Sequence, residues 1–231
     1  MIMKKIFLIL TLILFMVSQV HAYDPLLIFS GMPAAPPSGQ SFSDDFATDP
    51  FTSRFGYLTT IQWYHSGDSI FNYNSPAATA VYYNAGQTDT ANQYVKIESA
   101  PDDGYVGAAF RSDGTGSNGY YAVYIWGGSA YFSLWNDTGE ASEIESLGAV
   151  TYTSGNALGV TVCGTGASTV ARIWLSVTAN APGSCTSWDS GAADVTSSTD
   201  PGTYYDSNRY LGLVNGNWAH SHDNFYGGDV P

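Results

Sequence analysis

The chain has 231 residues, and its 20 acidic residues outnumber seven basic ones to give a formal net charge of −13. A chain this acidic is not expected to bind nucleic acid, because phosphate binding requires a basic surface. Acidity of this kind in a protein favours solubility, calcium affinity, or tolerance to saline or acidic surroundings.

The first 22 residues have the pattern of a secretory signal peptide. Lys4 and Lys5 precede an apolar run from Ile6 to Val17, and Val20-His21-Ala22 supplies a cleavage pattern that ends at Ala22. The run is shorter than the roughly 18 residues that a membrane-spanning helix needs. Cleavage removes two basic residues, so the net charge becomes 5 − 20 = −15. We expect a secreted protein, extracellular, on the cell surface or periplasmic, with no membrane span in the mature chain.

Residues 23–40 contain several prolines and small residues, which are typical of an extended linker. The segment also holds four consecutive large apolar residues, Leu26-Leu27-Ile28-Phe29. These apolar residues would not stabilise a free secreted tail. Either they pack on their own domain, or they pair with another molecule as a donated strand and make a homo-oligomer.

From residue 41 to 231, alternating apolar and polar runs are separated by Gly, Asn and Asp, without a helical period. Strands at this spacing predict a single all-β domain, either a sandwich or a barrel. The expected strands are Leu58–Tyr64, Ala80–Tyr83, Gln93–Glu98, Tyr105–Arg111, Tyr120–Trp126, Ala130–Asn136, Ala157–Cys163, Val170–Val177, Arg209–Val214 and Ser221–Tyr226. The similar motifs Asp44-Asp45-Phe46 and Asp223-Asn224-Phe225 predict that the first and last strands are neighbours.

Two hairpins can be predicted. Gly127-Gly128 separates the runs 120–126 and 129–135, and a Gly-Gly pair is a strong two-residue turn signal. The runs 157–163 and 170–177 form the second hairpin. Cys163 ends one of its strands and Cys185 follows the other. Two cysteines in an oxidising compartment favour a disulfide, which stabilises the fold by about 3 kcal/mol.

Strand alternation in the first hairpin places four aromatic side chains on a common outward face, with polar residues following them. The aromatic residues are Tyr124, Trp126, Tyr131 and Trp135, and the polar ones are Asn136 and Asp137. Aromatic rings with a polar edge suit sugar rings, whose C–H faces stack on them while the hydroxyls find polar partners. The alternative is that these rings simply fill or cover the sandwich.

Catalytic and metal-binding motifs are weaker. Glu143 and Glu145, next to Glu140, would share a strand face roughly 7 Å apart, inside the range of an inverting carboxylate pair. Catalytic pairs normally flank the substrate from different strands, so we favour a non-catalytic protein. His220 and His222 share a face if extended, but no third ligand has a diagnostic spacing.

Calcium has a better basis. Asp44, Asp45 and Asp223 come together if the terminal strands are neighbours, and hard oxygen ligands suit this ion. The alternative is that these aspartates only mark strand ends beside buried phenylalanines.

The chain resembles the concanavalin A-like (LamG-like) jelly-roll superfamily of secreted bacterial and phage-associated domains. The resemblance covers Ser41 to Asp229 and is carried by Asp44-Asp45-Phe46, Gly119-Tyr120-Tyr121, Leu158 to Val162, Ile173-Trp174-Leu175 and Asp223 to Gly228. It implies a two-sheet antiparallel jelly-roll sandwich, a frequent structural calcium, and a concave face or rim loops that bind glycans. The glucanase branch has Glu-x-Asp-x-x-Glu on one strand, which this chain lacks.

Three functions follow as hypotheses. The favoured one is a non-catalytic domain that binds polysaccharide or a glycosylated surface. The second is a structural subunit of an extracellular fibre or surface layer, assembled through residues 23–40. The third is a glycoside hydrolase or polysaccharide lyase.

Overall fold

The computed structural model describes residues 39–59, 63–72, 79–98, 105–216 and 221–231. The chain divides into two units, residues 1–38 and 39–231. The predicted signal peptide, the apolar run at 26–29 and His220 therefore lie outside the described residues. Within the described ranges, no helix is long and apolar enough to cross a membrane.

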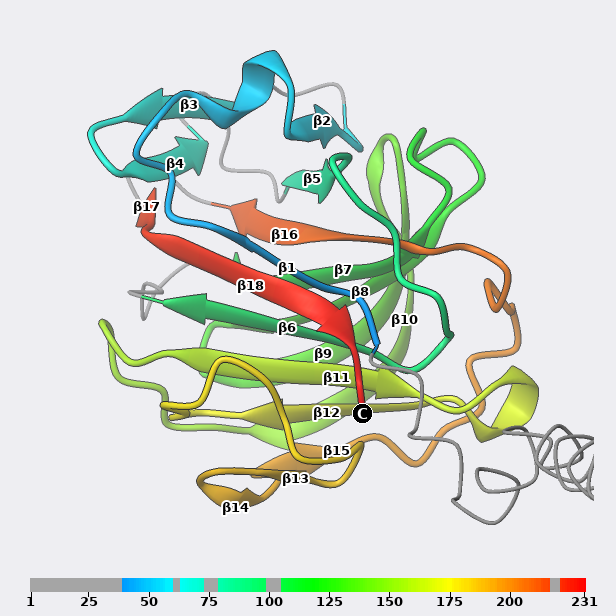
Figure 1. Ribbon diagram of the computed structural model, residues 1–231. Coiled ribbons are helices and arrows are strands. Elements are labelled where there is room, and N and C mark those ends of the chain that lie inside the picture. Colours follow the sequence, from blue (N-terminus) through cyan, green and yellow to red (C-terminus); the bar gives the residue numbers. More distant parts are fainter. Residues whose placement is uncertain (1–38, 60–62, 73–78, 99–104, 217–220) are drawn as a thin grey trace, which may run out of the picture. The chain divides into compact units, whose positions relative to one another are not determined.

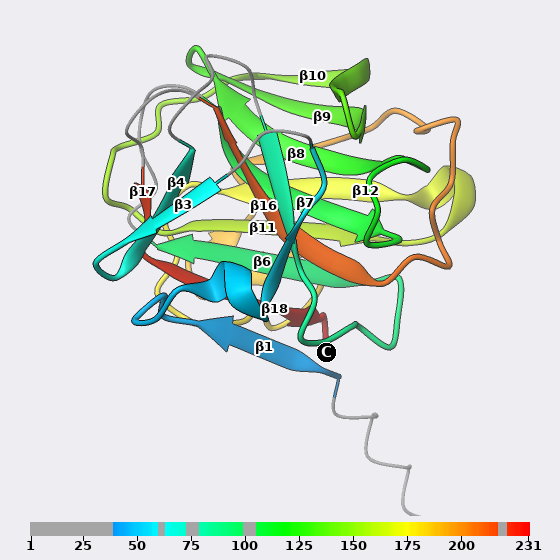
Figure 2. The same cartoon turned by 90° about the horizontal axis from the view of Figure 1, so that it is seen from above.

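Residues 39–231 form two large antiparallel sheets that lie one behind the other in Figure 1 and are seen from above in Figure 2. The six-stranded sheet has the order β1-β18-β6-β11-β12-β15, and the seven-stranded sheet has the order β10-β9-β8-β7-β16-β5-β2. Small sheets β17-β4-β3 and β13-β14 complete the described strands. The expected all-β, two-sheet jelly-roll sandwich is confirmed.

The strands are β1 (Ser41–Asp44), β2 (Phe55–Tyr57), β3 (Trp63–Ser66), β4 (Ser69–Asn72), β5 (Thr79–Tyr83), β6 (Gln93–Glu98), β7 (Tyr105–Ser112), β8 (Tyr120–Trp126), β9 (Ser129–Asn136), β10 (Gly139–Ala149), β11 (Leu158–Cys163), β12 (Val170–Trp174), β13 (Ser187–Trp188), β14 (Gly191–Ala192), β15 (Val195–Thr196), β16 (Tyr210–Gly216), β17 (Ser221–His222) and β18 (Asn224–Asp229). Two short 3-10 helices are Pro50–Thr52 and Gly166–Ser168.

The core lies between the two large sheets, because every second side chain of a strand points to the same face. In the six-stranded sheet, β6 contributes Val95 and Ile97, both fully buried. In the seven-stranded sheet, β8 contributes Tyr121 and Val123 to the same core cluster. Each such large apolar side chain stabilises the fold by about 1.5–3 kcal/mol when it leaves water.

The two terminal strands are neighbours, as the paired motifs predict. β1 pairs with β18 in the register Asp44↔Phe225, and Phe225 and Phe46 are both fully buried in the core. The Asp44 carboxylate accepts hydrogen bonds from the backbone N–H of Phe46 at 2.9 Å and from the Arg54 guanidinium at 2.5 and 3.2 Å. It thereby holds Phe46 at its positive φ of 53°, which is unfavourable for a bulky residue.

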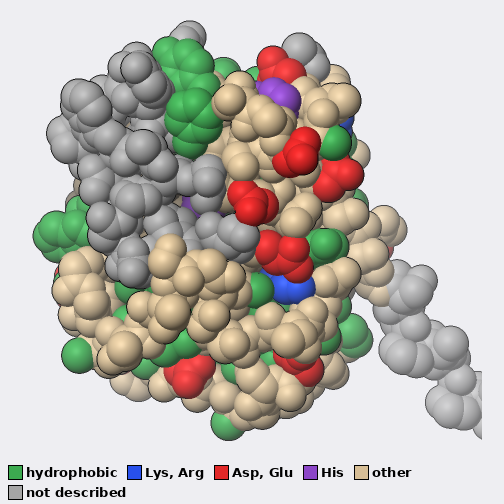
Figure 3. Space-filling view, turned by 90° about the vertical axis from the view of Figure 1, so that its left-hand side faces the viewer, with side chains coloured by type: hydrophobic (Ala, Val, Ile, Leu, Met, Phe, Trp, Pro, Cys, Tyr) green, Lys and Arg blue, Asp and Glu red, His purple; other side chains and the backbone are tan. Residues whose placement is uncertain are grey.

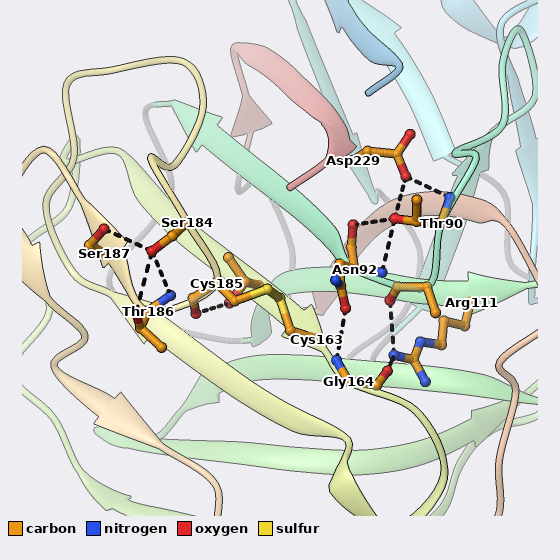
Figure 4. Close-up of a disulfide and its surroundings, with 12 residues drawn as sticks. Thr90, Asn92, Arg111, Cys163, Gly164, Ser184, Cys185, Thr186, Ser187 and Asp229 are labelled. Carbon is orange, nitrogen blue, oxygen red and sulfur yellow. Dashed lines mark hydrogen bonds between the residues drawn. A yellow bond between two sulfur atoms is a disulfide. The ribbon is translucent and has the colours of Figure 1, made fainter. Parts of the chain in front are cut away.

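The predicted disulfide is present and holds a strap, defined here as residues 178–193, against the outer face of the six-stranded sheet. Cys163 at the end of β11 is bonded to Cys185, with 6.1 Å between the two Cα atoms (Figure 4). Trp188 of the strap and Trp174 of β12 lie edge to face with ring centroids 5.5 Å apart. The Trp188 indole N–H donates to the carbonyl of Ala179 at 2.9 Å, so the strap covers a second apolar layer.

Arg111, at the end of β7, is fully buried and ties this strand to the other sheet (Figure 4). Its guanidinium donates to the Asp206 carboxylate, to Thr169 Oγ1 at 3.2 Å, and to the carbonyls of Ala91 and Gly164. A buried charge is tolerated only when it is paired and hydrogen-bonded in this way.

Several predicted strands differ from the structure. The predicted run Leu58–Tyr64 is not one strand, since β2 ends at Tyr57 and β3 begins at Trp63, and the run Ser221–Tyr226 is divided between β17 and β18. β12 ends at Trp174 and not at Val177, because the N–H of Leu175 donates to the Asp194 side chain at 2.7 Å and leaves the sheet ladder. The sequence pattern also missed β10, an eleven-residue edge strand that is mostly exposed and therefore has no apolar alternation.

Candidate functional site

Six aromatic side chains on the outer face of the seven-stranded sheet contact one another in one cluster, which we call the aromatic face. They are Tyr105 on β7, Tyr120, Tyr124 and Trp126 on β8, and Tyr131 and Trp135 on β9. Strand register brings them together, since Tyr120 is opposite Trp135 and Tyr124 is opposite Tyr131. The face therefore contains the four predicted aromatic residues, with two tyrosines that the prediction did not include.

The rings of the aromatic face pack on one another. Tyr105 stacks on Trp126 with centroids 5.1 Å apart and planes 11° apart, and Tyr124 stacks on Tyr131 at 5.3 Å. Trp135 meets Tyr124 edge to face at 5.5 Å. Each such aromatic pair adds about 0.5–1.5 kcal/mol beyond its buried area. The rings are therefore held in fixed orientations before any ligand arrives.

The expectation that all four predicted rings point outward to solvent is wrong for two of them. Tyr124 is 2% exposed and Trp135 is 0% exposed, whereas Trp126 is 47% exposed and Tyr131 is half-buried. Alternation gives the side of the sheet on which a ring lies, but neighbouring rings cover one another there. Only Trp126 and Tyr131 among the four offer a ring surface for stacking.

Small residues beneath the rings let them lie across the sheet. Gly107 on β7 is opposite Tyr124 on β8, and a Cβ atom on Gly107 would lie 2.2 Å from the Val123 carbonyl oxygen and 2.5 Å from the Tyr124 Cα. Ala109 and Ala122 continue the buried floor of this face. A larger residue at position 107 cannot be accommodated without moving the backbone.

Glu140 on β10 is an acidic residue that contacts the rings of the aromatic face. Its Oε1 atom accepts a hydrogen bond from the Ser133 hydroxyl at 2.7 Å and another from the Tyr124 hydroxyl at 2.9 Å. Glu140 is itself exposed. Two hydroxyl donors of the sheet therefore orient a carboxylate that remains accessible beside the stacked rings.

The tyrosine hydroxyls around Glu140 stay protonated. Burial raises the pKa of Tyr124 far above its ordinary value, and the charge of Glu140 raises it further against the opposing hydrogen bond from Ser133. Burial and the charge of Glu140 also raise the pKa of Tyr105. Tyr124 consequently acts as a hydrogen-bond donor to Glu140 over the whole physiological pH range.

Trp135 has a polar atom that the fold leaves unused. Its indole N–H is buried and has no hydrogen-bond acceptor in the described part of the chain. An unsatisfied buried donor costs about 1–3 kcal/mol. Buried donors without an acceptor are uncommon in folded proteins, and a role besides stability is one explanation for them.

The predicted pairing of Glu143 with Glu145 on one strand face is wrong. β10 contains register shifts, so that Glu143 is opposite Ser133 while Glu145 is opposite Phe132, a core residue. A bulge adds a residue and reverses the side on which the following side chains lie. It is Glu140 and Glu143 that share the aromatic face.

Glu145 is engaged elsewhere. Its carboxylate accepts hydrogen bonds from the N–H groups of Ser198 and Thr199, at 2.7 and 2.8 Å, and from the Ser198 hydroxyl at 2.9 Å. Burial acts to raise the pKa of Glu145, but these hydrogen bonds outweigh it and lower the pKa. Glu145 therefore fastens the loop at 198–199 to the edge strand.

Of the two predicted polar residues, Asn136 ends β9 and Asp137 lies in the turn between β9 and β10, at one end of the aromatic face. The Asn136 side chain accepts from the N–H and hydroxyl of Thr138 at 2.9 and 2.6 Å, which shapes the turn. Burial raises the pKa of Tyr120, and the charge of Asp137 raises it further, which places that charge near the ring. Asp137 thus adds negative potential at this end.

The aspartates predicted to bind calcium lie where β1 ends and the neighbouring β18 begins. Asp45 and Asp223 line a depression of about 340 Å³ together with Asp68, Ala47 and Asn224. Figure 3 shows Asp and Glu side chains gathered on this end of the molecule. Asp44 is paired with Arg54. Within the described ranges, no three His, Cys, Asp or Glu side chains are placed to hold a metal ion, and calcium stays a prediction.

The described histidines are not brought together as a metal site. The His65 ring Nε2 lies 2.6 Å from the carbonyl oxygen of Phe46. His222 is buried and stacks on Trp63, with ring centroids 5.9 Å apart. Both rings therefore take part in packing at the β3-β4-β17 end.

No family model matches the chain, and no curated protein matches it. Among solved structures, it is similar to the carbohydrate binding module CBM66 from Bacillus subtilis, with 11% identity and a TM-score of 0.49 over 74% of this chain and 91% of that one. It is also similar to the calcium-bound VIP36 exoplasmic/lumenal domain, with 7% identity and a TM-score of 0.47 over 83% and 90%. A legume lectin-like domain from Entamoeba histolytica gives 8% and 0.44 over 82% and 97%. Similarity at this level assigns no ligand to the chain.

Proposed function

We propose that this protein is a secreted, non-catalytic domain that binds a polysaccharide or a glycosylated surface through the aromatic face. The disulfide between Cys163 and Cys185 supports an oxidising compartment. The observation that carries the proposal is the exposed Trp126 ring, fixed by stacking on Tyr105 and adjoining Tyr131, on the face where the accessible Glu140 carboxylate accepts from Tyr124.

This combination suits a sugar ring for two reasons. The apolar C–H face of a sugar stacks on a flat aromatic surface, and Trp126 presents such a surface with 47% of its area exposed. Sugar hydroxyls need hydrogen-bond partners, which Glu140 can supply. Because the rings are already ordered by their neighbours, ligand binding loses little side-chain entropy.

The proposal is tested by retardation in gels that contain immobilised polysaccharides, and on a glycan array. Trp126→Ala should abolish binding while the thermal transition stays within a few degrees of wild type. Tyr204→Ala is the matched control, since Tyr204 is also 47% exposed but lies outside the aromatic face. Equal binding by wild type and Trp126→Ala contradicts the site assignment.

The non-catalytic part of the proposal has its own test. Glu140 and Glu143 share the aromatic face, so hydrolysis is the outcome to examine. We expect no release of reducing ends from a polysaccharide panel. Release that disappears in both Glu140→Gln and Glu143→Gln would show a hydrolase instead.

A further inference from the structure

The basic residues of the described chain all lie away from the aromatic face. Each is held by other parts of the sandwich. Arg54 pairs with Asp44, Lys96 with Glu98 and Arg111 with Asp206, whereas Arg209 donates to the carbonyls of Asp206 and Asn208, and Arg172 lies on β12 of the six-stranded sheet. The described part of this face therefore has no side chain that could neutralise an anionic ligand.

The acidic residues, in contrast, reach the aromatic face from the edge strand and its turn. Glu140 is opposite Trp135 and Glu143 is opposite Ser133, while Asp137 lies in the turn near Tyr120. The charge of Glu140 acts to raise the pKa of both Tyr105 and Tyr124. Glu140 thus contacts Tyr124, whose ring stacks on the half-buried Tyr131, so negative charge lies near partly exposed aromatic surface.

Resting on the proposed glycan-binding function, we propose that the ligand is a glycan with free amino groups, of which polymers of glucosamine are the chemical type. An ammonium group can donate to the Glu140 carboxylate, whose Oε1 is already oriented by Ser133 and Tyr124. Charge-assisted hydrogen bonds of this kind are the strong ones. The faces of Trp126 and Tyr131 also attract cations through their π-systems.

Two further features agree with a cationic ligand. The mature chain carries a net charge of 5 − 20 = −15 by its composition, which speeds the approach of a positively charged glycan and repels uronate or sulfated ones. The ring of Trp126 stacks on Tyr105 and not on a cation, so its outer surface stays available.

The test compares two hexasaccharides, one of glucosamine and one fully N-acetylated, by titration calorimetry at about pH 6, where glutamates are ionised. Wild type should bind the glucosamine oligomer about tenfold more tightly or better, as expected for a hydrogen bond to a charged group. Glu140→Gln should reduce the preference to below about threefold while retaining the binding of the acetylated oligomer.

Asp68→Asn is the matched control, because it removes one negative charge from the exposed turn between β3 and β4. It should keep the full preference, and a loss equal to that of Glu140→Gln would show attraction by bulk charge and overturn the inference. Equal affinity of wild type for both oligomers, or tighter binding of the acetylated one, overturns the amino-glycan inference and leaves the proposed function intact. Binding of neither oligomer overturns the inference, and the array and gel test then decides the proposed function separately.

Discussion

Removal of the disulfide should destabilise the protein without changing the aromatic face. Cys163 and Cys185 are 22 residues apart, for which the loop-entropy relation gives about 11 cal/mol/K, or about 3.4 kcal/mol at 25 °C. For a domain of this size, that loss lowers the melting temperature by about 7–13 °C. The strap covers the six-stranded sheet, so the Cys163→Ala, Cys185→Ala double variant should bind glycan like wild type.

Urea unfolding followed by tryptophan fluorescence measures this effect. The variant should have a lower free energy of unfolding and a larger m-value, because the unfolded chain without the cross-link exposes more surface. Reduced wild-type protein is the control, and it should unfold like the variant. A loss below about 1 kcal/mol, against the expected 3.4, would refute the assumption that the disulfide acts through the unfolded state.

Two further outcomes follow from single contacts. Glu145→Gln should remove one contribution to the acid sensitivity of the folded state. The pKa of Glu145 is lower in the folded state than in the unfolded state, where it is about 4.3. Its ionised carboxylate therefore stabilises the folded state at a pH above 4.3, and this stabilisation is lost as the pH falls through the folded pKa. The difference in melting temperature between wild type and variant should therefore become smaller as the pH falls from about 6 to about 3. Gly107→Ala should cost about 2–3 kcal/mol in urea unfolding, because its Cβ would overlap the Val123 carbonyl; an unchanged midpoint contradicts the close approach of β7 and β8.

The sequence was sufficient for features that depend on local pattern. The β8–β9 hairpin was predicted with its turn, since Gly127 and Gly128 both have the positive φ that such a turn demands. The neighbouring terminal strands and the disulfide were also predicted. In each case a short motif, or a pair of short motifs, carries the structural requirement.

Features that depend on tertiary neighbours were not predictable in this way. Strand alternation placed Tyr124 and Trp135 on the correct side of the sheet. Their burial depends on Tyr105 of the neighbouring strand β7, and no local sequence pattern shows that β7 is the neighbour of β8. Glu140 was missed as the oriented carboxylate because β10 is polar and bulged. A bulge changes which side a residue lies on, and single-sequence periodicity cannot locate it.

Glycan binding at the aromatic face is tested most directly by the tryptophan indole N–H resonances of a ¹⁵N-labelled sample. The sample is titrated with a glycan that the wild type binds. Trp126 and Trp135 lie on the aromatic face. Trp174 and Trp188 lie in the apolar layer between the strap and the six-stranded sheet. The expected result is a large shift for Trp126, whose ring is exposed, and none for Trp174 and Trp188. Shifts confined to Trp174 and Trp188, or to neither pair while binding is saturated, would contradict it.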